Sequence, residues 1–205
     1  MKSKILILLL MSLILSSCGS KKTVVKNYYL IELTPTHRAE IISDSLPLID
    51  AWCEIAEIRI SPAYATRDIA LRNQSHQIRY FENHEWAVRP SEAITHMIID
   101  FFSDSNIFKR VATRFWQVIP TYQIQTNINN LEVIQDGRTF YAHLNIELAL
   151  LDIRADQIIF SHSAVRKKEL EKRNLNLLAE TISELLFEEL SQFSNLIKDH
   201  FENER

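Results

Sequence analysis

Glycine is almost absent from this chain: the 205 residues contain two, Gly19 and Gly137. A phosphate-binding P-loop and a dinucleotide-binding fingerprint both need several closely spaced glycines, because the backbone must approach the phosphates. Neither motif can be built here. We therefore expect no ATPase, kinase or NAD-dependent enzyme, and no nucleotide cofactor.

The chain also lacks an excess of positive charge. It carries 23 lysines and arginines against 26 aspartates and glutamates, which gives a formal net charge of −3. No basic stripe with interleaved aromatic residues is present, and such a stripe is the usual mark of a nucleic-acid-binding surface. We expect no nucleic-acid partner.

Common catalytic and metal-binding motifs are missing as well. The seven histidines form no HExxH pattern, have no cysteine at ligand spacing, and no GxSxG elbow occurs. His143 and His162 could face each other across neighbouring strands, although decoration of a polar sheet face is the favoured interpretation. We expect no metal site, no cofactor and no catalytic residues, and thus no enzyme.

Only one long apolar run occurs, from Ile5 to Leu15, interrupted by Ser12. Eleven helical residues span about 16 Å, whereas the apolar core of a bilayer is about 30 Å thick. Lys2 and Lys4 precede the run, as in the basic start of an export signal. Residues 1–17 are therefore predicted to be a signal peptide that is removed.

The run ends in Leu15-Ser16-Ser17-Cys18, followed by Gly19. This resembles a bacterial lipobox, in which the cysteine is acylated and becomes the new N-terminus. The alternative is an ordinary secretory signal with an incidental cysteine. We expect acylated Cys18, a tether over residues 18–26 and a single domain over 27–205. Because Gly19 stands where an aspartate would favour the inner membrane, the outer membrane is the expected location, with the domain in the periplasm.

Acylation of Cys18 would leave Cys53 without a disulfide partner, and its apolar surroundings favour a core position. Hydrophobic periodicity predicts two helices, from Pro90 to about Asp104 and from Asn174 to Phe201. The segment 34–48 is interpreted as a surface loop. Alternation predicts strands over residues 27–33, 52–60, 68–72, 77–81, 108–115, 122–134, 139–154 and 158–170.

The last three strands form an antiparallel meander, with turns at Asp136-Gly137 and Asp156-Gln157. In the strand over 52–60, the set Glu54, Ala56, Ile58 and Ile60 is predicted to point inward. The fold class is therefore α+β: a mostly antiparallel sheet with two main helices packed on one face.

The stretch from Ile58 to Phe102 organises the domain. Its Trp86, just before the predicted helix that starts at Pro90, is interpreted as a plug between helix and sheet. The order of features resembles the ABC-type transport auxiliary lipoproteins, including PqiC-like members associated with MCE-type lipid transport systems. The matching features are the strand Ile58-Arg59-Ile60, the bend with Pro62 and Tyr64, the strand Ile69–Arg72, the strand Ile78–Phe81, and Trp86-Ala87 before the helix. Val88-Arg89-Pro90 departs from the family pattern.

This resemblance implies a lipid-anchored accessory protein that docks with MCE-domain and ABC permease or ATPase subunits and can self-associate. The residues expected to contact a partner are Arg79, Tyr80, His84, Trp86 and Arg89, although a structural role for each stays the favoured alternative. Two other functions remain open: an assembly lipoprotein of another envelope machine, and a direct lipid carrier.

Overall fold

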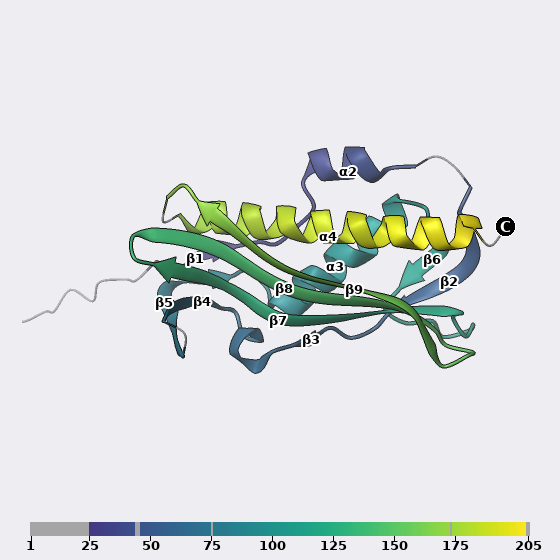
Figure 1. The fold of residues 1–205 in the computed structure, drawn as a ribbon, viewed down its shortest axis with the longest axis horizontal. Coiled ribbons are helices and arrows are strands. Elements are labelled where there is room, and N and C mark those ends of the chain that lie inside the picture. Colours follow the sequence, from purple (N-terminus) through teal and green to yellow (C-terminus); the bar gives the residue numbers. More distant parts are fainter. Residues whose placement is uncertain (1–24, 44–45, 75, 173, 204–205) are drawn as a thin grey trace, which may run out of the picture.

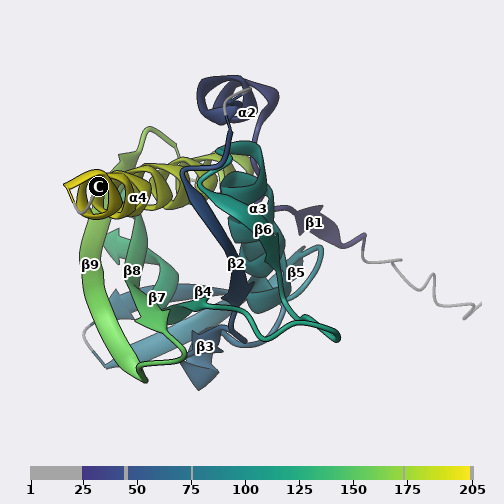
Figure 2. The same cartoon turned by 90° about the vertical axis from the view of Figure 1, so that its right-hand side faces the viewer.

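The computed structural model describes residues 25–43, 46–74, 76–172 and 174–203. Within these residues the chain forms one curved nine-stranded sheet, and helices α3 and α4 lie against one of its faces (Figure 1, Figure 2). This confirms the predicted α+β class. In chain order, the elements are β1 (Asn27–Tyr29), α2 (Pro35–Ile41), β2 (Ile49–Ile55), β3 (Arg59–Ile60), the 3-10 helix η1 (Pro62–Tyr64), β4 (Asp68–Gln74), β5 (Gln77–Trp86), α3 (Pro90–Asp104), β6 (Phe108–Ala112), β7 (Tyr122–Asp136), β8 (Thr139–Asp152), β9 (Gln157–Leu170) and α4 (Leu175–Asn203).

Strands β7, β8 and β9 form the predicted antiparallel meander. Tyr122 pairs with Asp152 at one end of β7, and Asp136 pairs with Thr139 at the other. Gly137 follows Asp136 with φ +58°, a left-handed conformation that glycine adopts without steric cost. Apolar side chains of β7 and β8 point toward the helices, and polar ones point to the opposite, helix-free face.

The other edge of β7 carries three short parallel partners in succession: β2, β3 and β4. Further out, β6 pairs in parallel with β2, β5 pairs antiparallel with β4, and β1 pairs in parallel with β5. The sheet is therefore mixed, with its longest pairs antiparallel. A single 15-residue strand, β7, joins the β8–β9 pair on one edge to the shorter strands on the other.

The predicted strand over 52–60 is two strands, and its predicted inward set is partly wrong. Within the predicted range, the buried side chains of β2 are Cys53 and Ile55, while Glu54 is half-buried; in the following residues Ile58 is buried. The phase changes because the backbone breaks from the strand at residues 56–58 before it pairs again with β7. A continuous alternation cannot represent that break.

Helices α3 and α4 supply much of the core. The apolar face of α3 is buried, and it comprises Ala93, Ile94, Met97, Ile98, Phe101 and Phe102. The Phe102 ring meets the Phe193 ring of α4 edge-on at 6.3 Å. The end of α4 stays on the sheet, because Phe201 packs against Tyr122 of β7 with ring centroids 5.4 Å apart. Among the residues that the structure describes, no helix is long and apolar enough to cross a membrane.

The segment 34–48, predicted as a loop, contains the short helix α2. Thr34 caps it by accepting a hydrogen bond from the His37 N–H at 3.2 Å, and Pro35 occupies its first turn. Arg38 then pairs with Asp100 and Asp104 of α3. A seven-residue helix is too short to show a clear hydrophobic period, and these tertiary contacts hold it in place.

Candidate docking surfaces

The five residues predicted to contact a partner lie on β5 and at the start of α3, but the structure distributes them over separate places. Cys18, the predicted acylation site, lies outside the described residues. Two buried polar clusters that the sequence did not reveal lie elsewhere in the domain.

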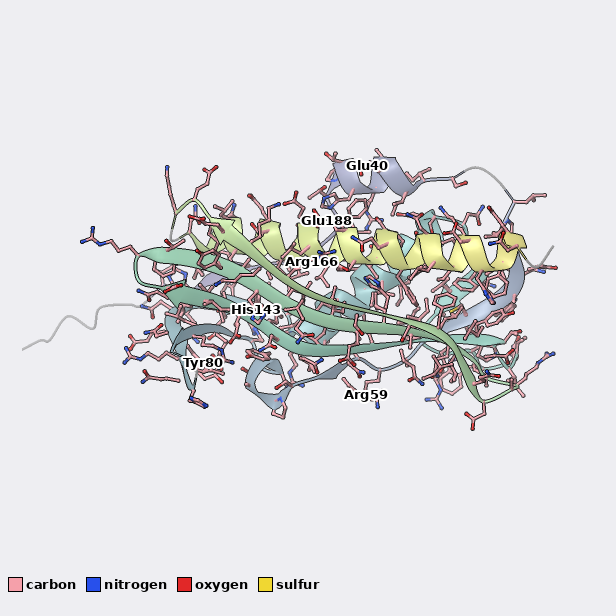
Figure 3. All side chains as sticks on the ribbon, in the orientation of Figure 1. Glu40, Arg59, Tyr80, His143, Arg166 and Glu188 are labelled. Atoms are coloured by element: carbon pink, nitrogen blue, oxygen red, sulfur yellow. The ribbon has the colours of Figure 1, made fainter. Side chains whose placement is uncertain are left out.

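Arg79 and Tyr80 lie on the exposed part of β5, where they pair with Leu71 and Ala70 of β4. The Tyr80 hydroxyl donates a hydrogen bond to the Ala63 carbonyl of η1 at 3.1 Å. Figure 3 shows Tyr80 toward one end of the molecule, at its lower left in this view. A fixed, half-exposed tyrosine beside an exposed arginine is a suitable contact pair for a polar partner surface.

His84 faces a different neighbourhood. Its Nδ1 shares a hydrogen bond with the Tyr29 hydroxyl at 2.8 Å, and its ring meets Phe81 edge-on at 6.2 Å. Burial raises the pKa of the Tyr29 hydroxyl, so this tyrosine stays neutral at physiological pH. With Lys172 and Leu175 near the start of α4, these rings line an open groove of about 540 Å³.

Trp86 is buried, with 3% of its surface exposed, which agrees with its interpretation as a plug between helix and sheet. Its backbone is held by Arg67: the Trp86 N–H donates to the Arg67 carbonyl at 2.8 Å, and Arg67 Nε donates to the Trp86 carbonyl at 2.9 Å. Arg89 is exposed at the N-cap of α3 and borders a second groove, of about 420 Å³, with His96 and Thr113.

The structure therefore joins Arg79 to Tyr80, sets His84 in its own groove, and leaves Arg89 at the start of the helix. Trp86 supports these positions from the core and has almost no surface for a partner. The predicted contact residues form neighbouring patches along β5 and α3 instead of one continuous surface.

A buried carboxylate lies on the helix-free face of the sheet, at Glu132 of β7. Arg72 Nε donates to both of its oxygens at 2.9 and 3.0 Å, the Tyr64 hydroxyl donates at 2.8 Å, and His143 Nδ1 lies 3.1 Å away. Asn130 Nδ2 donates at 3.2 Å. We call these five residues the Glu132 cluster.

Two opposing effects act on this carboxylate. Burial favours its neutral form, but hydrogen bonds from His143, Arg72 and Tyr64 together outweigh burial and lower the pKa of Glu132. Burial, followed by the hydrogen bond to Glu132, raises the pKa of Tyr64. The cluster thus holds one ionised carboxylate with all its neighbours donating, an arrangement that fixes η1 and β4 onto β7 and β8.

A second cluster ties β9 to α4 on the helix-covered face. Glu189 of α4 is fully buried and contacts both His162, with Nε2 to Oε2 at 2.6 Å, and Arg166. Figure 3 shows Arg166 where β9 borders α4. His143 and His162 therefore lie on opposite faces of the sheet and do not meet. Across the described ranges, no group of three or more histidine, cysteine, aspartate or glutamate residues could hold a metal ion.

The Glu132 cluster was not predicted from the sequence, although two of its five residues had already been noted. Tyr64 and Arg72 belong to the Pro-Tyr bend and the Arg-terminated strand that carry the family resemblance, and the structure brings both to Glu132. The available signal was the doublet Asn129-Asn130, which breaks the alternation of β7. A register shift between Ile128 and Asn130 occurs there and leaves Glu132 on the helix-free face.

Comparison with known proteins identifies the class. Residues 29–192 match the profile of the ABC-type transport auxiliary lipoprotein component, so the chain belongs to that family. Its members are membrane-anchored lipoproteins of transport systems in the cell envelope. No curated protein showed a significant sequence match.

Two solved structures share the fold. The crystal structure of protein XCC0632 from Xanthomonas campestris is 13% identical, covers 87% of this chain and 99% of its own, and has a TM-score of 0.72. The crystal structure of an uncharacterized protein is 11% identical, covers 84% of this chain and 99% of its own, and has a TM-score of 0.66. At these identities the likeness concerns the fold alone.

Proposed function

We propose that this protein is a non-catalytic docking subunit of an ABC transport system, held by acylated Cys18 at the periplasmic side of the outer membrane. Its partners are MCE-domain and permease or ATPase subunits that move lipids or other hydrophobic molecules. The family match over residues 29–192 carries this proposal. ATP would be hydrolysed by a separate subunit, because this chain lacks the glycines of a phosphate-binding loop.

The packing of the domain favours docking over lipid carriage. Large rings fill the space between the sheet and the helices: Phe101, Phe102 and Phe193 are each at most 1% exposed. The grooves described above open to solvent and are bordered by charged side chains such as Lys172 and Arg89. A carrier needs an apolar cavity that encloses most of its ligand.

The proposed partner surface comprises Arg79 and Tyr80, the groove beside His84, and Arg89. These positions combine arginine and tyrosine, which are enriched at interfaces, with a backbone held rigidly by β4 and α3. A rigid surface loses little conformational entropy when it docks.

In-cell photo-crosslinking tests this proposal. A photoreactive amino acid replaces Tyr80, His84 or Arg89 in turn in the otherwise unaltered protein, and adducts are identified by mass spectrometry. Val165, exposed on β9, serves as the matched control position. We expect adducts to an MCE-domain or permease subunit from the three test positions and none from position 165.

Other adducts would have different meanings. Adducts only to a second copy of this chain would assign the surface to self-association and move the partner surface elsewhere. Consistent adducts to an unrelated envelope machine, with no transport subunit from any position, would overturn the proposed function in favour of an assembly lipoprotein.

A further inference from the structure

The segment between β6 and β7 carries the most conspicuous exposed apolar side chains of the domain. Trp116 is 82% exposed and Ile119 is 75% exposed, and Val118 between them is exposed as well. We call residues 113–119 the tryptophan loop. A single exposed leucine needs no explanation, but a nearly free indole beside two aliphatic side chains indicates a contact surface.

The loop is held by the core at its base. The Phe115 ring packs against Trp52 of β2 with centroids 4.8 Å apart, and the Thr121 N–H donates to the Trp52 carbonyl at 3.0 Å. The Ile153 N–H then donates to the Thr121 carbonyl at 2.9 Å. These bonds fix both ends of the loop, so its apolar tip is presented to solvent by a supported backbone.

One arginine lies beside the apolar tip, and a second lies at the base of the loop, where Phe115 packs against Trp52. The Arg114 guanidinium lies 4.3 Å from the Trp116 ring centroid, and that of Arg110 lies 5.8 Å from the Trp52 ring. Neither arginine has a carboxylate partner among the ion pairs of the described residues. Unpaired guanidinium groups bind phosphates well, and tryptophan is enriched at the headgroup level of membranes.

The position of the loop relative to the N-terminus points to the same partner. Figure 2 shows β1 and the segment between β6 and β7 on the same side of the molecule, with the long strand β9 on the opposite side. Along the long axis β1 and β6 lie toward opposite ends, so the two segments mark the two ends of one side (Figure 1). In and near β1, the apolar side chains of Tyr28, Leu30 and Val88 are also exposed. The predicted anchor, Cys18, precedes Lys26 by eight residues. A stretch of that length reaches at most about 28 Å at ~3.5 Å per residue, so β1 must stay close to the bilayer.

We propose that the tryptophan loop inserts Trp116, Val118 and Ile119 into the headgroup region of the anchoring phospholipid bilayer, with Arg110 and Arg114 at the lipid phosphates. The acyl group attaches the protein, and the loop turns one side of the domain toward the membrane. The opposite side, with β8 and β9, then faces the periplasm. This inference rests on the lipid anchor of the proposed function. Because β5 pairs with β1, the proposed partner surface on β5 then lies beside the membrane-facing side, and a partner must approach it along the membrane surface.

Nitroxide accessibility on vesicles tests the proposal. The acylated protein is reconstituted with phosphatidylethanolamine and phosphatidylglycerol vesicles, after Trp116→Cys, Ile119→Cys or Val165→Cys substitution and spin labelling. Cys53 does not interfere, because it is fully buried and burial raises the pKa of its thiol. Val165 is an exposed apolar control on the side facing away.

We expect the labels at 116 and 119 to collide several-fold less with a water-soluble nickel complex, and more with oxygen, than the label at 165. Ile119→Cys provides an independent test should Trp116→Cys fold poorly. Equal nickel accessibility at all three positions on vesicle-bound protein would place the loop in water and overturn the loop insertion. Failure of the protein to float with vesicles would instead refute the anchor.

Discussion

At the scale of single residues, the Glu132 cluster shows how a charge is kept inside a small domain. The Glu132 side chain is fully buried, yet Arg72, Tyr64, His143 and Asn130 all point donors at it. A buried ion pair is weak evidence for stability by itself, but removal of one partner leaves the other uncompensated.

Glu132→Gln is expected to lower the free energy of unfolding by about 3 kcal/mol, because Arg72 then loses its carboxylate partner in a partly buried site. Urea unfolding followed by circular dichroism measures the change. The control is Glu147→Gln on the same face, where an exposed carboxylate accepts from Asn127 and Asn129; it should change stability by less than about 0.5 kcal/mol. Equal effects of the two substitutions would contradict a special role for Glu132.

The lowered pKa of Glu132 also predicts a pH dependence. Because its pKa in the folded protein lies below the ordinary value of 4.5, its contribution is complete above that value. As pH falls below 4.5 and through the folded pKa, the folded protein must bind a proton and the contribution is lost. The stability difference between wild type and Glu132→Gln should therefore shrink from pH 6 to pH 3, measured by urea titration at each pH. A difference that stayed constant would show that Glu132 has an ordinary pKa.

In the proposed function, the cellular location depends on acylation of Cys18. Cys18→Ser should abolish incorporation of labelled palmitate into the protein and prevent formation of a mature chain that begins at residue 18. Cys53→Ala should leave the labelling intact, because Cys53 is buried in β2. Labelling followed by gel fluorography and intact mass measures both. Undiminished labelling of Cys18→Ser would place the acyl group elsewhere.

At the scale of elements, α4 covers the sheet with a long apolar face and has more buried residues than α3. Its 29 residues lie along β8 and β9, with Leu186, Leu190, Phe193 and Ile197 fully buried. The helix is held at its centre by Glu189 and at its end by Phe201 against Tyr122. The helix is longer than most helices of globular proteins, but it contacts its own sheet as far as Phe201.

Phe193→Ala should cost about 3–5 kcal/mol, because it removes a ring that contacts both Phe102 and Phe160 and leaves a cavity. Leu196→Ala, three residues further on the same helix, changes a side chain that is 41% exposed and should cost under about 1 kcal/mol. Thermal unfolding of both variants makes the comparison. Similar losses would mean that α4 contacts the sheet through a different face.

At the scale of the whole molecule, β7 unites the domain. It pairs with β8 on one edge and with β2, β3 and β4 on the other, so the β8–β9 pair is joined to the short strands only through β7 in the described part of the chain. The charged side chains Arg166, Lys167 and Lys168 lie on the edge strand β9, where charge discourages further strand addition.

This continuity predicts one cooperative unfolding transition for residues 27–205. Tryptophan fluorescence reports on Trp52 of β2, the buried Trp86 of β5 and the exposed Trp116, and the signal change on unfolding comes mainly from the first two. It should have the same urea midpoint as far-UV circular dichroism, which reports on the entire chain. Midpoints that differ beyond error would divide the region into two independently unfolding parts and refute the single predicted domain.

Local patterns in the chain were sufficient to predict several elements. The meander, the hairpin at Gly137, helices α3 and α4, the α+β class and the family resemblance all follow from periodicity, turn residues and motif order, which are properties of neighbouring residues. The buried position of Trp86 follows from the same kind of reasoning. Because the apolar period of a helix or a meander strand already selects its buried face, these features needed no knowledge of distant contacts.

Long-range pairing decided the rest. Alternation does not specify which strands become neighbours, so the three parallel partners of β7, the changed phase after β2 and the placement of α2 appeared only in the folded chain. The Glu132 cluster unites Tyr64 and Glu132 from positions 68 residues apart, while residues close together on β5 point to separate places. The exposure of Trp116 was equally hidden, because an indole in the sequence looks the same whether the fold covers it or presents it to a membrane.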